Sequence, residues 1–318
     1  MVADEQLKIF SGSAHPDLAK RIAQEAGMEL GSVERKRFSD GEIWVKFNEN
    51  VRGCDVFLIQ PTRPPADNLL ELLILIDAAK RASARRITAV IPYFAYARQD
   101  RKDQPRVPIT ARLVADLIEA AGADRVLAMD LHAPQIQGFF KIPFDHIHAS
   151  KLYADWLREN PIPNLVIVAP DIGSIKLTRF YANQLDTDFA VVDKHRERAN
   201  EVAESNLIGE VAGRPALIVD DMIDTGNTFI ATIELLEREH ATEITAVVTH
   251  PIFSDKAVQN IEATKVKQVF VCDTLPTPQQ HLFRKIRLVS TAKLFAEAIL
   301  SIHHNRSLSS LFVQQLKT

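Results

Sequence analysis

The stretch IVDDMIDTGNTF, residues 218–229, ends in four residues whose types could cradle a phosphate: Thr225, Gly226, Asn227 and Thr228. A helix is predicted to begin near Thr228, with Thr225 and Asn227 as its caps. A loop that leads into a helix presents free N–H groups and the positive end of the helix dipole, and both attract an anion. Gly226 lets the backbone approach that anion closely, because it has no Cβ.

Three carboxylates come immediately before this cradle and would repel a phosphate that they faced: Asp220, Asp221 and Asp224. The chain has no GxxxxGK[ST] motif, so a nucleotide P-loop is excluded. The vicinal hydroxyls of a ribose donate hydrogen bonds to carboxylates, and Mg²⁺ also prefers such oxygen ligands. A phosphorylated ribose therefore fits the whole stretch. The alternative is an acidic first turn of a helix with ordinary caps.

The same stretch resembles the phosphoribosyl-diphosphate binding loop shared by phosphoribosyltransferases and ribose-phosphate pyrophosphokinases. Four further segments, in the same order along the chain, resemble the second family: RFSDGE (37–42), VIPYFAYARQDR (90–101), MDLHAPQIQGFF (129–140) and DKHRERANEV (193–202). The resemblance covers essentially the full length. It implies an ATP-dependent transferase of nucleotide biosynthesis, which moves the diphosphoryl group of ATP to the 1-hydroxyl of ribose 5-phosphate and releases AMP.

On this resemblance, two segments of the first half would bind ATP. Arg98 and Gln99 are similar to the family's ATP-contacting pair, although RQDRKDQPR by itself could be a solvated loop. Asp40, Gly41 and Glu42 resemble the segment that reads the adenine or ribose from a neighbouring subunit, although SDGE by itself is an ordinary turn. The resemblance therefore also implies a homo-oligomer, a hexamer built from dimers.

The resemblance assigns metal and catalytic roles to four further residues. His132 and Asp171 match the family's metal-binding residues, with Mg²⁺ as the metal, although a lone histidine is more often structural. Lys194 and Arg196 match two cations on a mobile catalytic flap, where they would stabilise the transferring group. An isolated KHRER would instead be a surface charge run.

The resemblance implies that Asp220 and Asp221 bind the sugar hydroxyls of ribose 5-phosphate. The loop from Asp224 to Thr228 and Arg196 would take the 5-phosphate, with Asp224 as the least explained of the acids.

Three places depart from the family's pattern. The diphosphate loop, usually close to P-D-x-G-G, has Ile172 and ends in Ser174, and Lys141 follows QGFF where Asp is common. Residues 253–256 read FSDK instead of F-S-G-P. These changes bear on regulation, on the number of metal ions bound and on the catalytic rate. Two other functions stay open: a phosphoribosyltransferase, and a weakly active regulatory paralogue of the synthetase.

Apolar runs that alternate with helical periods must position these residues. Strands are predicted at 7–10, 55–60, 87–91, 125–129, 165–169, 189–192, 216–219, 244–248 and 269–272, and helices at 68–83, 110–121, 175–185 and 228–240. Most strands are continuously apolar, which is typical of parallel strands covered on both faces. The predicted fold is α/β, with mostly parallel sheets flanked by helices.

A faint repeat indicates two related domains, which the resemblance implies are of phosphoribosyltransferase type. RITAVI (86–91) resembles EITAVV (243–248), and VLAMD (126–130) resembles VFVCD (269–273); chance similarity of apolar strands is the alternative. The predicted domains are residues 1–148 on the ATP side and 149–318 on the ribose 5-phosphate side. The last twenty or so residues are expected to pack back on the first domain.

Composition limits the class of protein. The net charge of −3 leaves no basic excess for binding nucleic acid in general. The longest apolar run, residues 69–79, contains Glu71 and Asp77 and is too short to span a bilayer, and the N-terminus does not read as a signal peptide. Cys54 and Cys272 lie in or beside apolar runs, which fits a reducing compartment. A cytoplasmic protein without membrane partners is therefore predicted.

Overall fold

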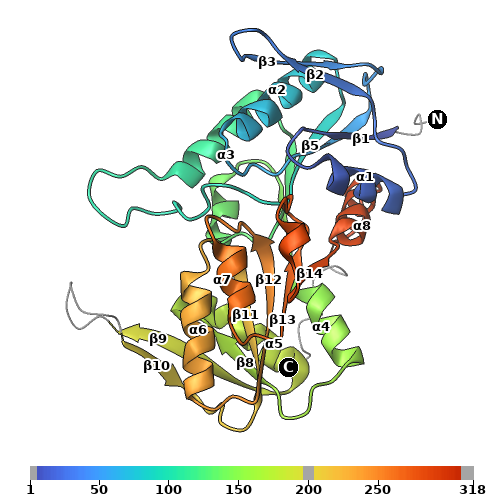
Figure 1. The fold of residues 1–318 in the computed structure, drawn as a ribbon. Helices are drawn as coiled ribbons and strands as arrows, with labels where there is room; N and C mark the ends of the chain where they lie inside the picture. Colours follow the sequence, from blue (N-terminus) through green and yellow to red (C-terminus); the bar gives the residue numbers. More distant parts are fainter. Residues whose placement is uncertain (1–5, 196–203, 309–318) are drawn as a thin grey trace. The chain divides into compact units, whose positions relative to one another are not determined.

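A computed structural model describes residues 6–195 and 204–308 (Figure 1). The chain forms two compact units. The first contains the chain up to His148, Thr274–Pro276 and the chain from Ser290 onward, and the second contains Ala149–Asp273 and Thr277–Val289. Among the described residues, no helix has both the length and the apolar content that a membrane span requires.

The first unit is built on a five-stranded parallel sheet in the order β1-β4-β5-β6-β7. Its strands are β1 (Leu7–Ser11), β4 (Asp55–Ile59), β5 (Arg86–Ile91), β6 (Arg125–Met129) and β7 (Phe144–Ile147). Its helices are α1 (Pro16–Glu25), α2 (Asp67–Arg81), α3 (Thr110–Ala121), the 3₁₀ helix η1 (Pro134–Phe139) and α8 (Ala292–His303). A separate antiparallel hairpin joins β2 (Val33–Arg37) and β3 (Ile43–Phe47).

The second unit is built on a seven-stranded sheet in the order β10-β9-β8-β11-β12-β13-β14, parallel except for β10. Its strands are β8 (Val166–Ala169), β9 (Asp188–His195), β10 (Glu204–Ile208), β11 (Pro215–Ile223), β12 (Glu243–Pro251), β13 (Gln268–Cys272) and β14 (Ile286–Val289). Its helices are α4 (Ser150–Glu159), α5 (Ile175–Leu185), α6 (Asn227–Arg238), α7 (Ala257–Ala263), η2 (Ile172–Ser174) and η3 (Gln280–Leu282).

Burial explains why the apolar runs became central strands. Every residue of β4 and of β8 is buried, as expected for parallel strands with both faces covered. Helix α2 buries Leu72, Leu75, Ile76 and Ala79, which recur at helical spacing and form one apolar stripe. The predicted α/β class with mostly parallel sheets is thereby confirmed.

The two units share one chain order, which confirms that the domains are related. Strands β1, β4, β5, β6 and β7 run in the same order as β8, β11, β12, β13 and β14. In each half a two-stranded hairpin follows the first long helix: β2–β3 after α1, and β9–β10 after α5. The helix that follows the fifth strand of each half, α4 or α8, belongs to the opposite unit.

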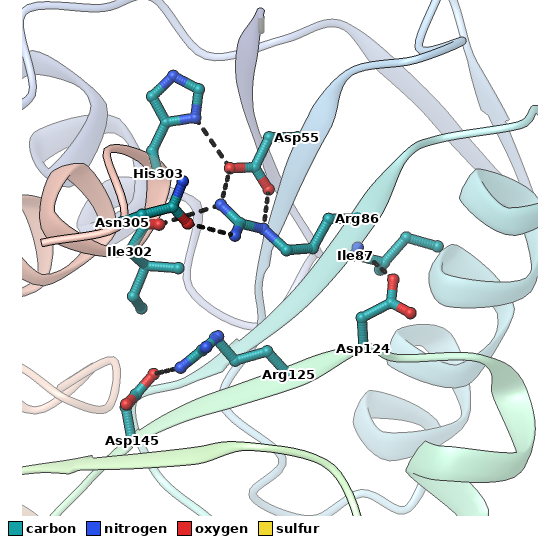
Figure 2. Close-up of polar contacts among 9 residues, drawn as sticks. All are labelled: Asp55, Arg86, Ile87, Asp124, Arg125, Asp145, Ile302, His303 and Asn305. Atoms are coloured by element: carbon teal, nitrogen blue, oxygen red, sulfur yellow. Dashed lines mark hydrogen bonds and ion pairs between the residues drawn. The ribbon is translucent and has the colours of Figure 1, made fainter.

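Polar contacts at the amino ends of the strands attach α8 to the first unit (Figure 2). The Asp55 side chain is only 1% exposed and accepts two hydrogen bonds from Arg86, one of them from Nε at 2.9 Å. His303 Nδ1 lies 2.8 Å from Asp55 Oδ2, and Arg86 Nη2 donates to the Ile302 carbonyl at 3.1 Å. One buried carboxylate thus links the first residues of β4 and β5 to the end of α8.

The structure extends two strands beyond their predicted ends. Strand β11 was predicted to end at Val219 but continues to Ile223, and β9 was predicted to end at Val192 but continues to His195. The reason is pairing: β11 stays in register with β12 through Ile223, and β9 pairs with β10 through His195. Hydropathy alone could not show this, because both extensions contain charged residues.

Candidate functional site

The second unit contains a topological switch point between β8 and β11. The chain leaves β8 toward β9 on one side, whereas β11, β12 and β13 lie on the other side. Ligands of α/β proteins bind in the crevice at the carboxyl ends of the strands where the order reverses. In the first unit the order β1-β4-β5-β6-β7 follows the chain and does not reverse.

Asp171 and Asp220 lie at this switch point and are joined by Ser174. Asp171 follows β8 and caps η2, where its Oδ1 accepts from the backbone N–H of Ser174 at 3.2 Å. The Ser174 hydroxyl donates to Asp220 Oδ1 at 2.8 Å, and the Asp221 N–H donates to the same oxygen at 2.9 Å. Asp220 and Asp221 themselves lie inside β11. The structure therefore brings Asp171 and the acidic pair together.

Burial and like charges shift the titration of Asp220. Burial away from water raises the pKa of Asp220 well above its ordinary value, and the negative charge of Asp221 raises it further. The Ser174 hydroxyl acts in the opposite direction, because it donates to the ionised carboxylate. A ligand that brings hydroxyl donors or positive charge would favour the ionised form of Asp220.

The loop 224–228 leads from β11 into α6, much as the sequence indicates. Helix α6 begins at Asn227, one residue before the predicted start, and Gly226 is its N-cap with φ +82°. The prediction that Thr225 and Asn227 cap the helix is wrong, since the N-cap makes no side-chain hydrogen bond. Glycine takes the cap position because its left-handed φ is costly for other residues.

The loop is also anchored by the segment that follows β12, and the first turn of α6 suits an anion. The Ser254 N–H donates to the Asp224 carbonyl at 3.1 Å, and the Phe253 N–H donates to the Ile223 carbonyl at the same distance. The first N–H groups of any helix have no acceptor inside the helix. Positive dipole and donors together make this turn attractive to a phosphate.

Lys194 was predicted on a loop, but its backbone lies in β9. It pairs with Ser205 in the antiparallel β9–β10 ribbon, and it lies three residues beyond Val191, which pairs with the last residue of β8. The strand persists because β10 supplies hydrogen-bonding partners after β8 has ended. Arg196 lies outside the described residues.

The remaining predicted residues lie in the first unit. Asp40, Gly41 and Glu42 form the exposed turn of the β2–β3 hairpin, with Gly41 at φ +97°. The Asp40 carboxylate accepts from the Glu42 N–H at 3.1 Å and so fixes the turn. The turn is therefore an ordered, exposed hairpin tip.

Arg98 and Gln99 follow β5, and both are exposed. The Gln99 side-chain oxygen accepts from Thr110 Oγ1 at 2.5 Å, and its carbonyl accepts from the Ala111 N–H at 3.2 Å. Gln99 thus also holds the start of α3, which is a structural role that the sequence did not indicate.

His132 is exposed on the loop after β6, beside three residues that the sequence prediction missed. Asp130, His146 and His148 present ligand atoms within 4.8 Å of one another, the only such group of three found among the described residues. The Asp130–His148 contact measures 2.9 Å from Oδ1 to Nδ1. The signal was available: an aspartate at a strand end and His-x-His at the end of the next strand.

Hydrogen bonds favour a structural role for His146 rather than metal ligation. The Leu131 N–H donates to His146 Nε2 at 2.8 Å, so we infer that this nitrogen carries no proton. The other nitrogen, Nδ1, lies 3.3 Å from the Gln137 amide. A metal at Nε2 would have to displace the backbone N–H of Leu131. His146 instead holds the loop that carries His132.

Asp130 controls the charge of His148. Burial lowers the pKa of His148, but the hydrogen bond to Asp130 and the negative charge of that carboxylate outweigh it and leave the pKa above its ordinary value. The pair therefore favours an imidazolium beside a carboxylate at the carboxyl ends of β6 and β7.

The departures from the family pattern have local explanations. Asp255 has φ +54°, so the position where the pattern has glycine does require a left-handed backbone, which Asp tolerates better than most residues. Lys141 is exposed, and the nearby Asp145 is paired with Arg125 at 2.5 Å. Ser174, by contrast, donates hydrogen bonds to Asp171 and Asp220 at the switch point.

Comparisons with known proteins agree along the chain. Residues 7–122 match a family model described as the N-terminal domain of ribose phosphate pyrophosphokinase, and residues 196–313 match one described as the phosphoribosyl synthetase-associated domain.

Named relatives cover nearly the whole chain. A ribose-phosphate pyrophosphokinase of Wolinella succinogenes is 51% identical over 96% of this chain and 99% of its own. One of Gloeobacter violaceus is 48% identical over 98% of this chain and 95% of its own. The crystal structure of phosphoribosylpyrophosphate synthetase from Mycobacterium smegmatis has a TM-score of 0.89 and 39% identity, and the match covers 95% of this chain and 100% of that one.

Proposed function

The chain belongs to the ribose-phosphate pyrophosphokinase family and is an ATP-dependent transferase of that class, and we propose how its residues divide the reaction. The diphosphoryl group of ATP moves to the 1-hydroxyl of ribose 5-phosphate, which gives phosphoribosyl diphosphate and AMP. The observation that carries the proposal is the acidic pair of β11, at the switch point and directly before the α6 N-terminus.

Ribose 5-phosphate occupies the crevice of the second unit. Asp220 and Asp221 accept hydrogen bonds from the sugar hydroxyls, since a carboxylate offers only acceptors. The 5-phosphate takes the N–H groups of the loop formed by Asp224, Thr225, Gly226, Asn227 and Thr228. Support comes from the Gly226 cap, which leaves the first turn of α6 without a side-chain acceptor at its N-cap.

ATP is taken by segments of the first unit and by a neighbouring subunit. Arg98 and Gln99 contact the nucleotide, because an arginine fork suits phosphate or base stacking and an amide both donates and accepts. Asp40, Gly41 and Glu42 come from another copy of the chain, and the exposure of this hairpin tip supports that assignment. The active assembly is thus a homo-oligomer, a hexamer by family resemblance.

Mg²⁺ is the divalent metal of the reaction. The crevice fits it, because Asp171 and Asp220 supply oxygen ligands, which Mg²⁺ prefers, and Ser174 holds the two carboxylates near each other. Asp171 would hold the metal in the second unit, and by family resemblance His132 of the first unit is proposed as a metal-binding residue that acts through a bound water or on ATP directly. The metal would supply charge neutralisation for the transferring phosphates.

Lys194 and Arg196 stabilise the charge that develops on the transferring group. Phosphoryl transfer needs positioning and charge neutralisation more than covalent help. The β9–β10 ribbon reaches past the end of β8, and β8 leads directly into the loop of Asp171.

Both cysteines, Cys54 and Cys272, are free and buried, which supports the cytoplasm as the compartment.

Product analysis tests the proposal. The protein is incubated with ATP, Mg²⁺ and ribose 5-phosphate, and nucleotides are separated by ion-exchange chromatography. AMP should appear only when both substrates are present. Formation of ADP, or no turnover, would contradict the proposal. A parallel incubation of phosphoribosyl diphosphate with nucleobases should release no diphosphate, since that release defines a phosphoribosyltransferase.

A further inference from the structure

We propose that Ser174 is a positioning residue that orients Asp220 toward ribose 5-phosphate, a role that rests on the proposed function of the second unit. The family's pattern usually has glycine at this position, and Ser174 adds a hydroxyl there. Its hydroxyl donates to Asp220 Oδ1 at 2.8 Å, while its backbone N–H donates to Asp171 Oδ1 at 3.2 Å. One residue therefore holds both acids of the crevice.

The two distances show which acid the hydroxyl serves. Ser174 Oγ lies 2.8 Å from Asp220 Oδ1 but 3.4 Å from Asp171 Oδ1. A hydroxyl has a single proton to donate, and the shorter contact is the normal hydrogen-bond length. The hydroxyl is therefore committed to Asp220, and Asp171 depends on the backbone of Ser174.

Ser174 is itself held firmly enough to orient another residue. It is buried, with 9% exposure, and its carbonyl accepts from Thr178 Oγ1 at 2.9 Å; Thr178 is fully buried. Its backbone has φ −86° and ψ 0°, which any L residue adopts, so the serine side chain adds no strain.

The glycine that the loop does keep shows why position 174 could change. A Cβ on Gly173 would lie 3.1 Å from Asp171 Oδ1, which is tighter than an ordinary contact. Position 174 carries no such restriction, since its side chain already lies in the crevice and makes a hydrogen bond. The loop leaves less room for a side chain at position 173 than at position 174.

The two hydrogen bonds to Asp220 orient its carboxylate for binding ribose 5-phosphate. Asp220 Oδ1 receives the Ser174 hydroxyl and the Asp221 N–H at 2.8 and 2.9 Å. Two donors on one oxygen fix the plane of the carboxylate and thereby the direction in which Oδ2 points. Removing the Ser174 hydroxyl frees the carboxylate to rotate, so ribose 5-phosphate should bind more weakly while ATP binding is unaffected.

The test compares Ser174→Ala, Ser174→Gly and Ser174→Thr with the unchanged protein, in steady-state assays of AMP formation. The KM for ribose 5-phosphate should rise about tenfold in the Ala and Gly variants, the effect of one hydrogen bond to a charged group. The KM for ATP should stay within about twofold of the unchanged protein. Thr keeps the hydroxyl and should restore the KM for ribose 5-phosphate.

A matched control removes a hydroxyl from α8, by Ser301→Ala, and should leave both KM values unchanged. Unchanged KM for ribose 5-phosphate in the Ala and Gly variants would overturn the proposal, and so would an equal rise for both substrates. If the Ala and Gly variants unfold, Ser174→Thr provides the test. A KM for ribose 5-phosphate in the Thr variant far above that of the unchanged protein would count against a role of the hydroxyl. Absence of AMP with the unchanged protein would overturn the proposed function instead.

Discussion

The acidic pair of β11 works against the stability of the fold that holds it. Burial and the charge of Asp221 raise the pKa of Asp220 well above 3.8, the value of an unperturbed group. The unfolded chain therefore loses this proton at a lower pH than the folded chain does. As the pH rises from that lower value through the raised one, folded protein loses stability relative to unfolded protein.

Asp220→Asn should therefore stabilise the protein, and increasingly so as the pH rises. Asparagine has nearly the same shape but cannot ionise, so the loss described above disappears. Melting temperatures of both proteins, measured from about pH 5 to about pH 8, should diverge with rising pH. The exposed Gln24→Ala, which changes no ionisable group, serves as control and should show no such divergence. If the melting temperatures of Asp220→Asn and of the unchanged protein differed by the same amount at every pH, ionisation of Asp220 would not destabilise the folded protein.

Gly226 is required for its backbone conformation, not for space. A Cβ there would meet no atom closer than 3.7 Å, yet φ is +82°. Gly226→Ala should cost about 1–2 kcal/mol of unfolding free energy, measured by urea denaturation. Gly138→Ala is the control, because neither a left-handed φ nor a close contact restricts it. Equal stability of the two variants would show that the loop relaxes freely.

Among the elements, the β9–β10 ribbon can be altered without unfolding the sheet. It lies at one edge of the seven-stranded sheet, with β10 outermost. Lys194→Ala should lower kcat about 10²–10³-fold, the typical loss when one preorganised charge-stabilising group is removed. The melting temperature should change little. The exposed Lys265→Ala provides the control, and a Lys194→Ala variant with full kcat but a lowered melting temperature would assign Lys194 a structural role.

The polar contacts of α8 should matter far more than surface ion pairs of the same type. Arg86 pairs with Asp55, whose side chain is 1% exposed, so Arg86→Ala removes two hydrogen bonds and a permanent positive charge from a buried carboxylate and leaves it the contact with His303. We expect a loss of about 3–5 kcal/mol in unfolding free energy. Arg81 pairs with Asp77 on the surface, at 79% and 47% exposure, and Arg81→Ala should change stability little. Similar losses in both variants would contradict the burial argument.

Predictability differed between the interiors and the ends of elements. Central strands such as β5 and β6 could be located from continuous apolar runs, because burial on both faces demands apolar residues. The hairpin strand β2 was missed because VERKR is almost entirely exposed and carries no apolar signal. Its partner β3 was missed although IWVKF is mostly apolar, and none of its residues is fully buried. Strand β14 was missed for a related reason, since it is only four residues long.

The site could be predicted only where chemistry is local in sequence. The 218–229 stretch contains its acids and the proposed phosphate-binding loop side by side, and α6 begins within one residue of the expected position. The caps could not be predicted, because Thr225 and Asn227 are good cap residues and only the backbone of Gly226 decided against them. The bond from Ser174 to Asp220 joins positions 46 residues apart, which no local pattern reveals.

At the scale of the molecule, duplication of one α/β plan produced two unequal halves. Both halves have five strands in the same order, but only the second inserts a hairpin strand into its sheet beside the first strand. That insertion creates the order reversal between β8 and β11, where we propose that ribose 5-phosphate binds. In the first half the hairpin forms a separate two-stranded sheet, and the Asp40–Glu42 turn lies at its exposed tip.

The central claim is that the chain moves a diphosphoryl group from ATP to ribose 5-phosphate. The most direct measurement uses ATP labelled with ³²P at the γ-phosphate, with Mg²⁺ and ribose 5-phosphate, and follows the label by chromatography. The account predicts that the label enters phosphoribosyl diphosphate while unlabelled AMP forms in equal amount. Label in free phosphate with ADP as the nucleotide product, or label that stays in ATP, would contradict it.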